Sequence, residues 1–130
     1  MAKNIGAILP GDLIEATSSL AENIVQSEVF LRFKQSNKSL QFDAEAMALL
    51  SEFSELQSKL RSTQLNNSIS EKDIQRLRNV QGEILTNDSI QEKELAEENA
   101  VAFVREINQE ISGLLGFDFA TFARRSSGCC

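Results

Sequence analysis

The chain has 130 residues, with 19 acidic against 13 basic side chains and no histidine. The net charge of −6 disfavours direct binding to nucleic-acid phosphates, and the lack of histidine removes the commonest general base and the commonest metal ligand. One proline, six glycines and no tryptophan or tyrosine favour a single all-α domain over a turn-rich β fold.

The N-terminal part of the chain is predicted to be a loose arm followed by a bent helix. Residues 1–11 form the arm, which ends at Pro10-Gly11, and Asp12 can cap the helix that follows. Apolar positions then recur at helical spacing, at Leu13, Ala16, Leu20 and Ile24. The pattern changes phase near Ser27, so we expect a break there and a helix that resumes to about Lys38.

Two further helices are predicted in the middle of the chain. Residues 37–43 are interpreted as a connection, with Asp43 as the N-cap of a helix over residues 45–65. The pair Asn66-Asn67 interrupts the pattern, and Ser70 begins a sequence close to a capping box. A shorter helix, in which Gly82 lowers the intrinsic stability, extends from there to about residue 85.

The longest helical pattern covers residues 89–115, and its apolar stripe must be covered by other segments. Short connections between amphipathic helices predict antiparallel neighbours. We therefore expect an all-α fold: an antiparallel bundle of four to five helices over residues 12–116, with a long C-terminal helix. Residues 117–130 form a phenylalanine-containing cap and a flexible tail. Phe117, Phe119 and Phe122 either close the end of the bundle or dock on a partner, and closure is the preferred interpretation.

Carboxylates on the long helix raise the alternative of an enzyme. They are Glu94, Glu97, Glu98, Glu106 and Glu110. Ferritin-like di-iron bundles combine inward glutamates with histidine, which this chain lacks, and these acids fall on the polar face of the helix. A solvated face is therefore preferred, and we predict that the chain is not an enzyme.

The sequence also bears on cellular location. No apolar run approaches the length of a membrane-spanning helix, and the N-terminus lacks the long apolar region of a signal peptide. We expect a cytoplasmic protein. Direct RNA binding is disfavoured by the net acidity, since the only tight basic pairs, Arg76/Arg78 and Arg124/Arg125, are not interleaved with exposed aromatic residues.

The residues from about Asp12 to Leu115 resemble the YlbF/YmcA family of bacterial regulators. The front half of the resemblance is carried by Leu20-Ala21, Ile24, Ser27-Glu28, Phe33, Asp43, Glu45-Ala46, Leu50, Phe53, Leu56-Gln57 and Leu60. In the back half, residues 65–115 resemble the family's asparagine-rich turn, short helix and long final helix.

The resemblance implies a non-catalytic helical adaptor, associated in Gram-positive bacteria with competence, sporulation and biofilm control. It implies protein partners similar to YlbF, YmcA and YaaT, and an influence on mRNA processing by the endoribonuclease RNase Y. We expect a homodimer or a hetero-oligomer, because a bundle this small leaves apolar stripes uncovered.

Cys129 and Cys130 are the only cysteines and end the chain. The resemblance implies that they bind an iron–sulfur cluster or soft metal shared with another subunit, since some family members bind a cluster through a cysteine-rich tail. A cluster usually needs four thiolates, and adjacent cysteines grip one metal poorly. A mobile, redox-labile end is therefore the preferred interpretation, and no cofactor is firmly predicted. A lipid anchor of the doubly prenylated type is discounted, because the chain has no phosphate-binding loop.

Overall fold

The computed structural model describes residues 8–65, 68 and 70–125. These residues form six α-helices and no strand. The helices are α1 (Gly11–Gln26), α2 (Glu28–Phe42), α3 (Ala44–Gln64), α4 (Glu71–Thr86), α5 (Asp88–Leu115) and α6 (Phe119–Ala123). The prediction of an all-α fold with a long C-terminal helix is confirmed.

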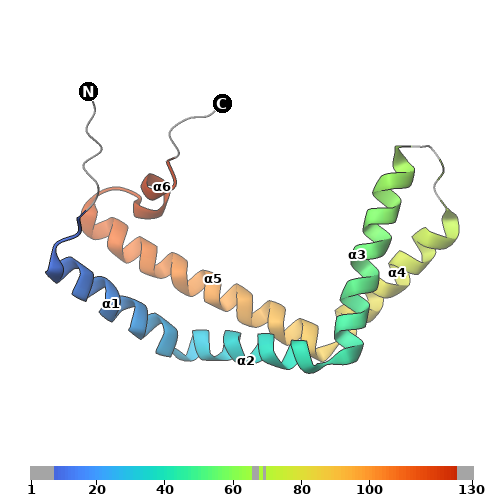
Figure 1. Cartoon of the computed structure of the whole chain (residues 1–130), viewed down its shortest axis with the longest axis horizontal. Coiled ribbons are helices and arrows are strands. Elements are labelled where there is room, and N and C mark those ends of the chain that lie inside the picture. The colour runs from blue at the N-terminus through green and yellow to red at the C-terminus, as the bar shows by residue number, and fades with distance from the viewer. Residues whose placement is uncertain (1–7, 66–67, 69, 126–130) are drawn as a thin grey trace.

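The helices lie in two antiparallel arms that meet at one corner (Figure 1). In the first, which we call the long arm, α1 and α2 run one way and α5 returns beside them. In the second, the hairpin arm, α3 and α4 pack against each other. Antiparallel packing was predicted, but the helices do not close into one bundle around a common axis. The outline is an open U.

The corner between the arms, which we call the elbow, holds most of the buried apolar residues. Leu40 of α2, Ala46 and Leu49 of α3, Val80 of α4 and Ile90 of α5 form one buried cluster. Four helices meet there, and each packs against two of the others: α2 and α4 both contact α3 and α5. Full burial of a valine, leucine or isoleucine side chain stabilises a fold by about 1.5–3 kcal/mol, so the elbow is the main source of stability in the chain.

Asp43 ties the two connections of the elbow together. One carboxylate oxygen, Oδ1, accepts a hydrogen bond from the backbone N–H of Ala46 at 3.0 Å and so caps α3. The other, Oδ2, accepts one from the hydroxyl of Ser89 in α5 at 2.6 Å. These hydrogen bonds, that of Ser89 above all, lower the pKa of Asp43 below its ordinary value. Asn87 caps α5 in the same corner, where its Oδ1 accepts from the N–H of Ile90 at 3.1 Å.

Several helix boundaries differ from the predictions. The break at Ser27 is confirmed: Ser27 is extended, and its hydroxyl caps α2. The predicted connection over residues 37–43 is wrong, because α2 continues to Phe42 and only Asp43 separates it from α3. No glycine or proline interrupts residues 37–42, so nothing ends the helix before the cap of the next one begins.

Two predicted helix caps also differ from those in the structure. Asp12 was expected to cap α1 but lies inside its first turn, because the helix begins at Gly11 directly after Pro10. Ser70 occupies the N-cap position of α4, but its side chain makes no capping hydrogen bond. Most of the predicted arm (residues 1–7), the pair Asn66-Asn67 and residues 126–130 of the tail lie outside the described residues.

Candidate protein-binding surfaces

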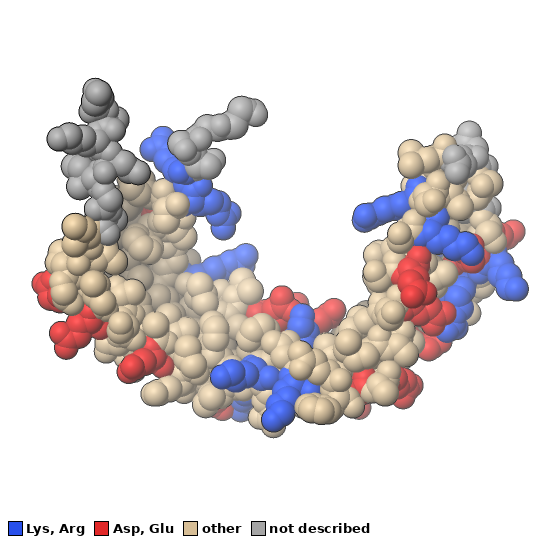
Figure 2. Space-filling model, viewed as in Figure 1, with Lys and Arg blue, Asp and Glu red and all other residues tan. Residues whose placement is uncertain are grey.

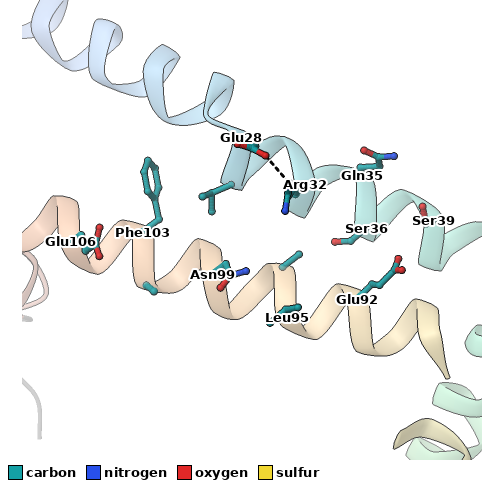
Figure 3. Close-up of a pocket in the computed structure, with 13 residues that line it drawn as sticks. Glu28, Arg32, Gln35, Ser36, Ser39, Glu92, Leu95, Asn99, Phe103 and Glu106 are labelled. Atoms are coloured by element: carbon teal, nitrogen blue, oxygen red, sulfur yellow. Dashed lines mark hydrogen bonds and ion pairs between the residues drawn. The ribbon is translucent and has the colours of Figure 1, made fainter. Parts of the chain in front are cut away.

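A groove of about 620 Å³ runs along the long arm between α2 and α5 (Figure 3). Its apolar and small lining includes Val29 and Ser36 from α2 and Leu95, Ala96, Ala102 and Phe103 from α5. Phe103 also contacts Phe30 of α2, with ring centroids 6.1 Å apart, which holds the two helices together at one end of the groove. The helices are thus in contact, yet they leave an open channel along one side.

Charged side chains border this groove. Glu28, Glu92 and Glu106 line it together with a single guanidinium, that of Arg32. Arg32 is paired within its own helix, since its Nη2 lies 2.6 Å from a carboxylate oxygen of Glu28. The groove therefore combines an apolar floor with an acidic border, which suits a side chain or an amphipathic helix of another protein that carries flanking basic residues.

A second surface lies at the end of the long arm away from the elbow. We call it the open end and define it as residues 8–26 of the α1 segment and residues 101–125 of the α5–α6 segment. None of the residues of α1 is buried, although α1 carries a clear apolar stripe. Large apolar side chains that are at least two-fifths exposed are concentrated here: Ile8, Leu9, Leu13, Ile14, Leu20, Val25, Val101, Val104, Leu114, Leu115, Phe117, Phe119 and Phe122.

The phenylalanine segment folds back on the end of α5. Gly116 has a left-handed backbone, with φ of 82°, and ends α5. The backbone N–H groups of Phe119 and Ala120 then donate to the side chains of Ser112 and Asn108, at 2.9 and 3.0 Å. Asp118 caps α6, and this hydrogen bonding to Thr121 lowers the pKa of Asp118.

The three phenylalanine rings remain in contact with solvent. Phe117 and Phe122 contact each other, with ring centroids 5.2 Å apart. Phe117, Phe119 and Phe122 are nevertheless between 46% and 59% exposed. The segment lies against α5 while leaving much of its aromatic surface uncovered.

In the hairpin arm, ion pairs between charged side chains join α3 to α4. Arg76 donates two hydrogen bonds to the carboxylate of Glu52, at 2.6 and 2.8 Å, and lies 3.5 Å from Glu83. The guanidinium lowers the pKa of Glu52, and the carboxylate raises the pKa of Arg76. One residue of the basic pair Arg76/Arg78 is thus occupied within the chain, which leaves it less suited to a phosphate contact.

The predicted carboxylates of α5 do not converge on a site. Glu94, Glu98, Glu106 and Glu110 are exposed. Glu97 is half-exposed and paired with Lys93 one turn away on the same helix. Within the described residues, no group of three or more histidine, cysteine, aspartate or glutamate side chains is arranged to hold a metal ion. The carboxylates therefore form a polar helix face, as the preferred interpretation expected.

Cys129 and Cys130 lie outside the described residues, so the predicted cluster or metal site stays a prediction. The groove, in contrast, was missed by sequence reasoning. Its signal is a run of small side chains at helical spacing beside the main stripe of α5: Ala96, Asn99 and Ala102. Such small residues leave space between two packed helices where larger ones would fill it.

None of the described helices is both long enough and apolar enough to cross a membrane. A comparison with curated protein sequences finds no match. Among solved structures, the chain is similar to RicA of Bacillus subtilis, whose crystal structure was determined in complex with RicF. The two share 23% sequence identity over 81% of this chain and 94% of RicA, with a TM-score of 0.71, so the likeness establishes a shared fold.

The match of the sequence to a protein family is more direct evidence of relationship than the structural likeness. Residues 13–115 match the family described as control of competence regulator ComK, YlbF/YmcA. This match covers α1 from its third residue, the whole elbow and all of α5. It is a family of regulators, not one defined by a catalytic activity. The chain therefore belongs to the YlbF/YmcA family of competence regulators.

Proposed function

We propose that this chain is a non-enzymatic regulatory adaptor that works in the cytoplasm as a subunit of protein complexes. Its expected partners are YlbF-, YmcA- and YaaT-like proteins and RNase Y, and its expected effect is on RNase Y-dependent mRNA processing and on competence, sporulation or biofilm formation. Membership of a regulator family supports this proposal. The similar protein RicA was crystallised in complex with another protein, RicF, which supports protein partners.

One structural observation carries the proposal: the long arm consists of paired helices with no further layer over them. α2 and α5 pack on each other, and the described residues provide no helix that covers the groove between them. Contiguous apolar surface of this kind marks sites of protein association in soluble proteins. The acidic border of the groove then selects for partners with basic residues beside an apolar stripe.

Co-purification from the native cell tests this proposal. The chain is tagged, crosslinked mildly in cells, and its partners are quantified by mass spectrometry. Ala102 lines the groove and Ala48 lies exposed on α3, so Ala102→Trp and Ala48→Trp make a matched pair. We expect wild type and Ala48→Trp to retain the YlbF/YmcA-type, YaaT-like and RNase Y proteins and Ala102→Trp to lose at least one of them. Wild type that recovers none of these proteins contradicts the proposal.

The alternative function, an iron–sulfur or soft-metal sensor built on Cys129 and Cys130, rests on the sequence alone. Its test is anaerobic reconstitution with iron and sulfide, with and without the partners above, followed by the visible spectrum. Thiolate-to-iron absorption that disappears in Cys129→Ser/Cys130→Ser supports this alternative. A spectrum without it, in the presence of partners, rules it out.

A further inference from the structure

One side of the hairpin arm, which extends away from the long arm beyond the elbow (Figure 1), carries ion pairs between its two helices. They join Glu52 to Arg76 and Lys59 to Asp73. Glu83 also lies 3.5 Å from Arg76 on the same helix. Figure 2 shows acidic and basic side chains interleaved on the visible side of the hairpin arm. The charges that form these pairs largely neutralise one another within the chain.

The other side of the α3–α4 contact, which we call the arginine face, is differently charged. Its residues recur at spacings of three and four along each helix, which places them on one face. They are Leu50, Ser54, Gln57, Arg61 and Gln64 of α3 and Ile74, Leu77, Arg78, Gln81 and Leu85 of α4, and none of them is acidic. Arg61 and Arg78 are exposed, and among the described residues no ion pair engages either of them. The arginine face therefore presents unpaired positive charge on an otherwise uncharged surface.

A pocket of about 290 Å³ lies in the arginine face, where the end of α3 meets the beginning of α4. Its apolar lining comes from Leu60, Ile74 and Leu77, and its polar lining from Gln57, Arg61 and Gln64. None of the ion-paired residues described above lines it. Pockets for drug-sized ligands have volumes of about 300–1,000 Å³, so this pocket suits a single side chain of a partner protein better than a cofactor.

The chemistry of the arginine face suits an acidic protein segment. A guanidinium donates two parallel hydrogen bonds to a carboxylate, and glutamine amides donate further ones. A nucleic acid would meet fewer favourable groups, because no residue of this face is aromatic and only Arg61 and Arg78 are basic. The exposed side chain of Leu85 extends the apolar part of the face toward the elbow. An amphipathic helix presents carboxylates and an apolar stripe side by side, which matches this combination.

We propose that the arginine face is a docking site for an acidic amphipathic helix of a partner protein. An apolar side chain of that helix enters the pocket, and carboxylates beside it pair with Arg61 and Arg78. The groove of the long arm has an acidic border and favours a basic partner, so the two sites select partners of opposite charge. One chain can then hold two different proteins. The inference rests on the proposed adaptor function and adds a second docking site to it.

Peptide binding to the full chain tests this proposal. The probe is a fluorescein-labelled helical peptide of about 18 residues, roughly 27 Å long, with a leucine stripe flanked by glutamates. Fluorescence anisotropy measures its dissociation constant. Arg61→Glu/Arg78→Glu should raise this constant about tenfold or more, because like charges then face the peptide. Gln57→Trp should raise it as well, because the indole fills the pocket without changing the net charge.

Each variant has a control that makes the same chemical change elsewhere. Lys34→Glu/Lys72→Glu changes the net charge equally, but both lysines are exposed and lie outside the arginine face. Gln75→Trp places an indole at an exposed position of α4 outside that face. Both controls should leave the dissociation constant within about twofold of wild type at about 0.15 M salt, where distant charges are screened. Circular dichroism checks that every variant keeps its helical content.

A charge-swapped peptide separates recognition from misfolding. With lysines in place of the glutamates, the peptide should bind Arg61→Glu/Arg78→Glu more tightly than it binds wild type. The proposal is overturned by a glutamate peptide that shows no saturable binding to wild type up to about 1 mM, or that binds wild type and the reversed chain equally. It is also overturned by a single-stranded RNA that displaces the peptide and binds wild type more tightly, because the arginine face would then be a nucleic-acid site.

The outcome is independent of the co-purification experiment with Ala102→Trp, which tests the groove of the long arm. Failure of the peptide experiment alone removes the docking site on the hairpin arm and leaves the adaptor function standing. Wild type that recovers no partner in cells overturns the adaptor function, and the docking site with it.

Discussion

The elbow and the open end are built from the same kind of amphipathic helix, yet they differ in burial. At the elbow four helices converge, and Val80 and Ile90 are 0% and 2% exposed. At the open end, the helical apolar side chains Leu13, Ile14 and Val104 stay almost half exposed. An apolar stripe is buried only where enough neighbours surround it. The open end thus has apolar helix faces that the described residues do not bury, and in our account another protein surface covers them.

The largest expected effect separates these two regions directly. Ile90→Ala leaves a cavity in the elbow and should lower the free energy of unfolding by about 2–5 kcal/mol. Ile14→Ala makes the same chemical change on exposed α1, and in dilute, monomeric protein it should cost no more than about 0.5 kcal/mol. Denaturant unfolding followed by circular dichroism measures both. Equal losses would show that the open end is as well packed as the elbow.

A second substitution targets the connection between the arms. Asp43→Ala removes both the cap of α3 and the hydrogen bond from Ser89. We expect a clear fall in the midpoint of thermal unfolding and faster hydrogen exchange in the first turns of α3 and α5. Asp12→Ala is the control, since among the described residues Asp12 accepts a hydrogen bond only from the N–H of its neighbour Leu13. An equally large fall in the unfolding midpoint of Asp12→Ala would contradict the claim that the hydrogen bonds of Asp43 stabilise the elbow.

The pH dependence of stability sharpens the same comparison. The pKa values of Asp43 and Glu52 are both lowered in the folded chain, by Ser89 and Arg76 respectively. Folding then favours the ionised carboxylates, so their contribution is complete above the ordinary carboxyl pKa and is lost as the pH falls through the lowered values.

Asp43→Asn makes this measurable, because asparagine can still cap α3 but does not titrate. The difference in unfolding free energy between wild type and Asp43→Asn should be largest near neutral pH and shrink in acid. A difference that stays constant across the acidic range would show that ionised Asp43 does not stabilise the elbow.

The smallest effects come from two glycines. A Cβ added at Gly82 meets no atom within 4 Å, and α4 gains helix propensity, so Gly82→Ala should stabilise the hairpin arm by about 0.5–1 kcal/mol. Gly116 has a positive φ, which L-residues rarely adopt. Gly116→Ala should therefore destabilise the turn into α6 by about 1 kcal/mol. Thermal unfolding measures the effect of Gly82→Ala, and hydrogen exchange of α6 measures the effect of Gly116→Ala. We expect the two substitutions to change stability in opposite directions.

The sequence predicts helix positions well because each helix carries its own local signals. The helix predicted over residues 89–115 and the cap at Asp43 are both found close to where spacing and residue type place them. The arrangement of the helices was not predictable in the same way. A stripe shows which face avoids water, but not which helix covers it.

The U shape depends on the single-residue corner at Asp43 and on contacts between residues far apart in the sequence, such as Asp43 with Ser89. The groove depends on small side chains of α5 facing α2, and neither α2 nor α5 alone reveals it. The same limit applies to partners. The pattern of Leu13 and Leu20 in α1 predicts that something covers them, and only the structure shows that the described residues leave both side chains exposed.

Hydroxyl-radical footprinting of the protein in its native assembly and as a diluted, isolated chain tests the central claim most directly. The account predicts that Leu13, Leu20, Val104 and Phe122 of the open end become several-fold less reactive on assembly, while Val80 and Ile90 of the elbow are protected in both states. Open-end side chains that oxidise equally in the assembled and isolated protein would contradict it.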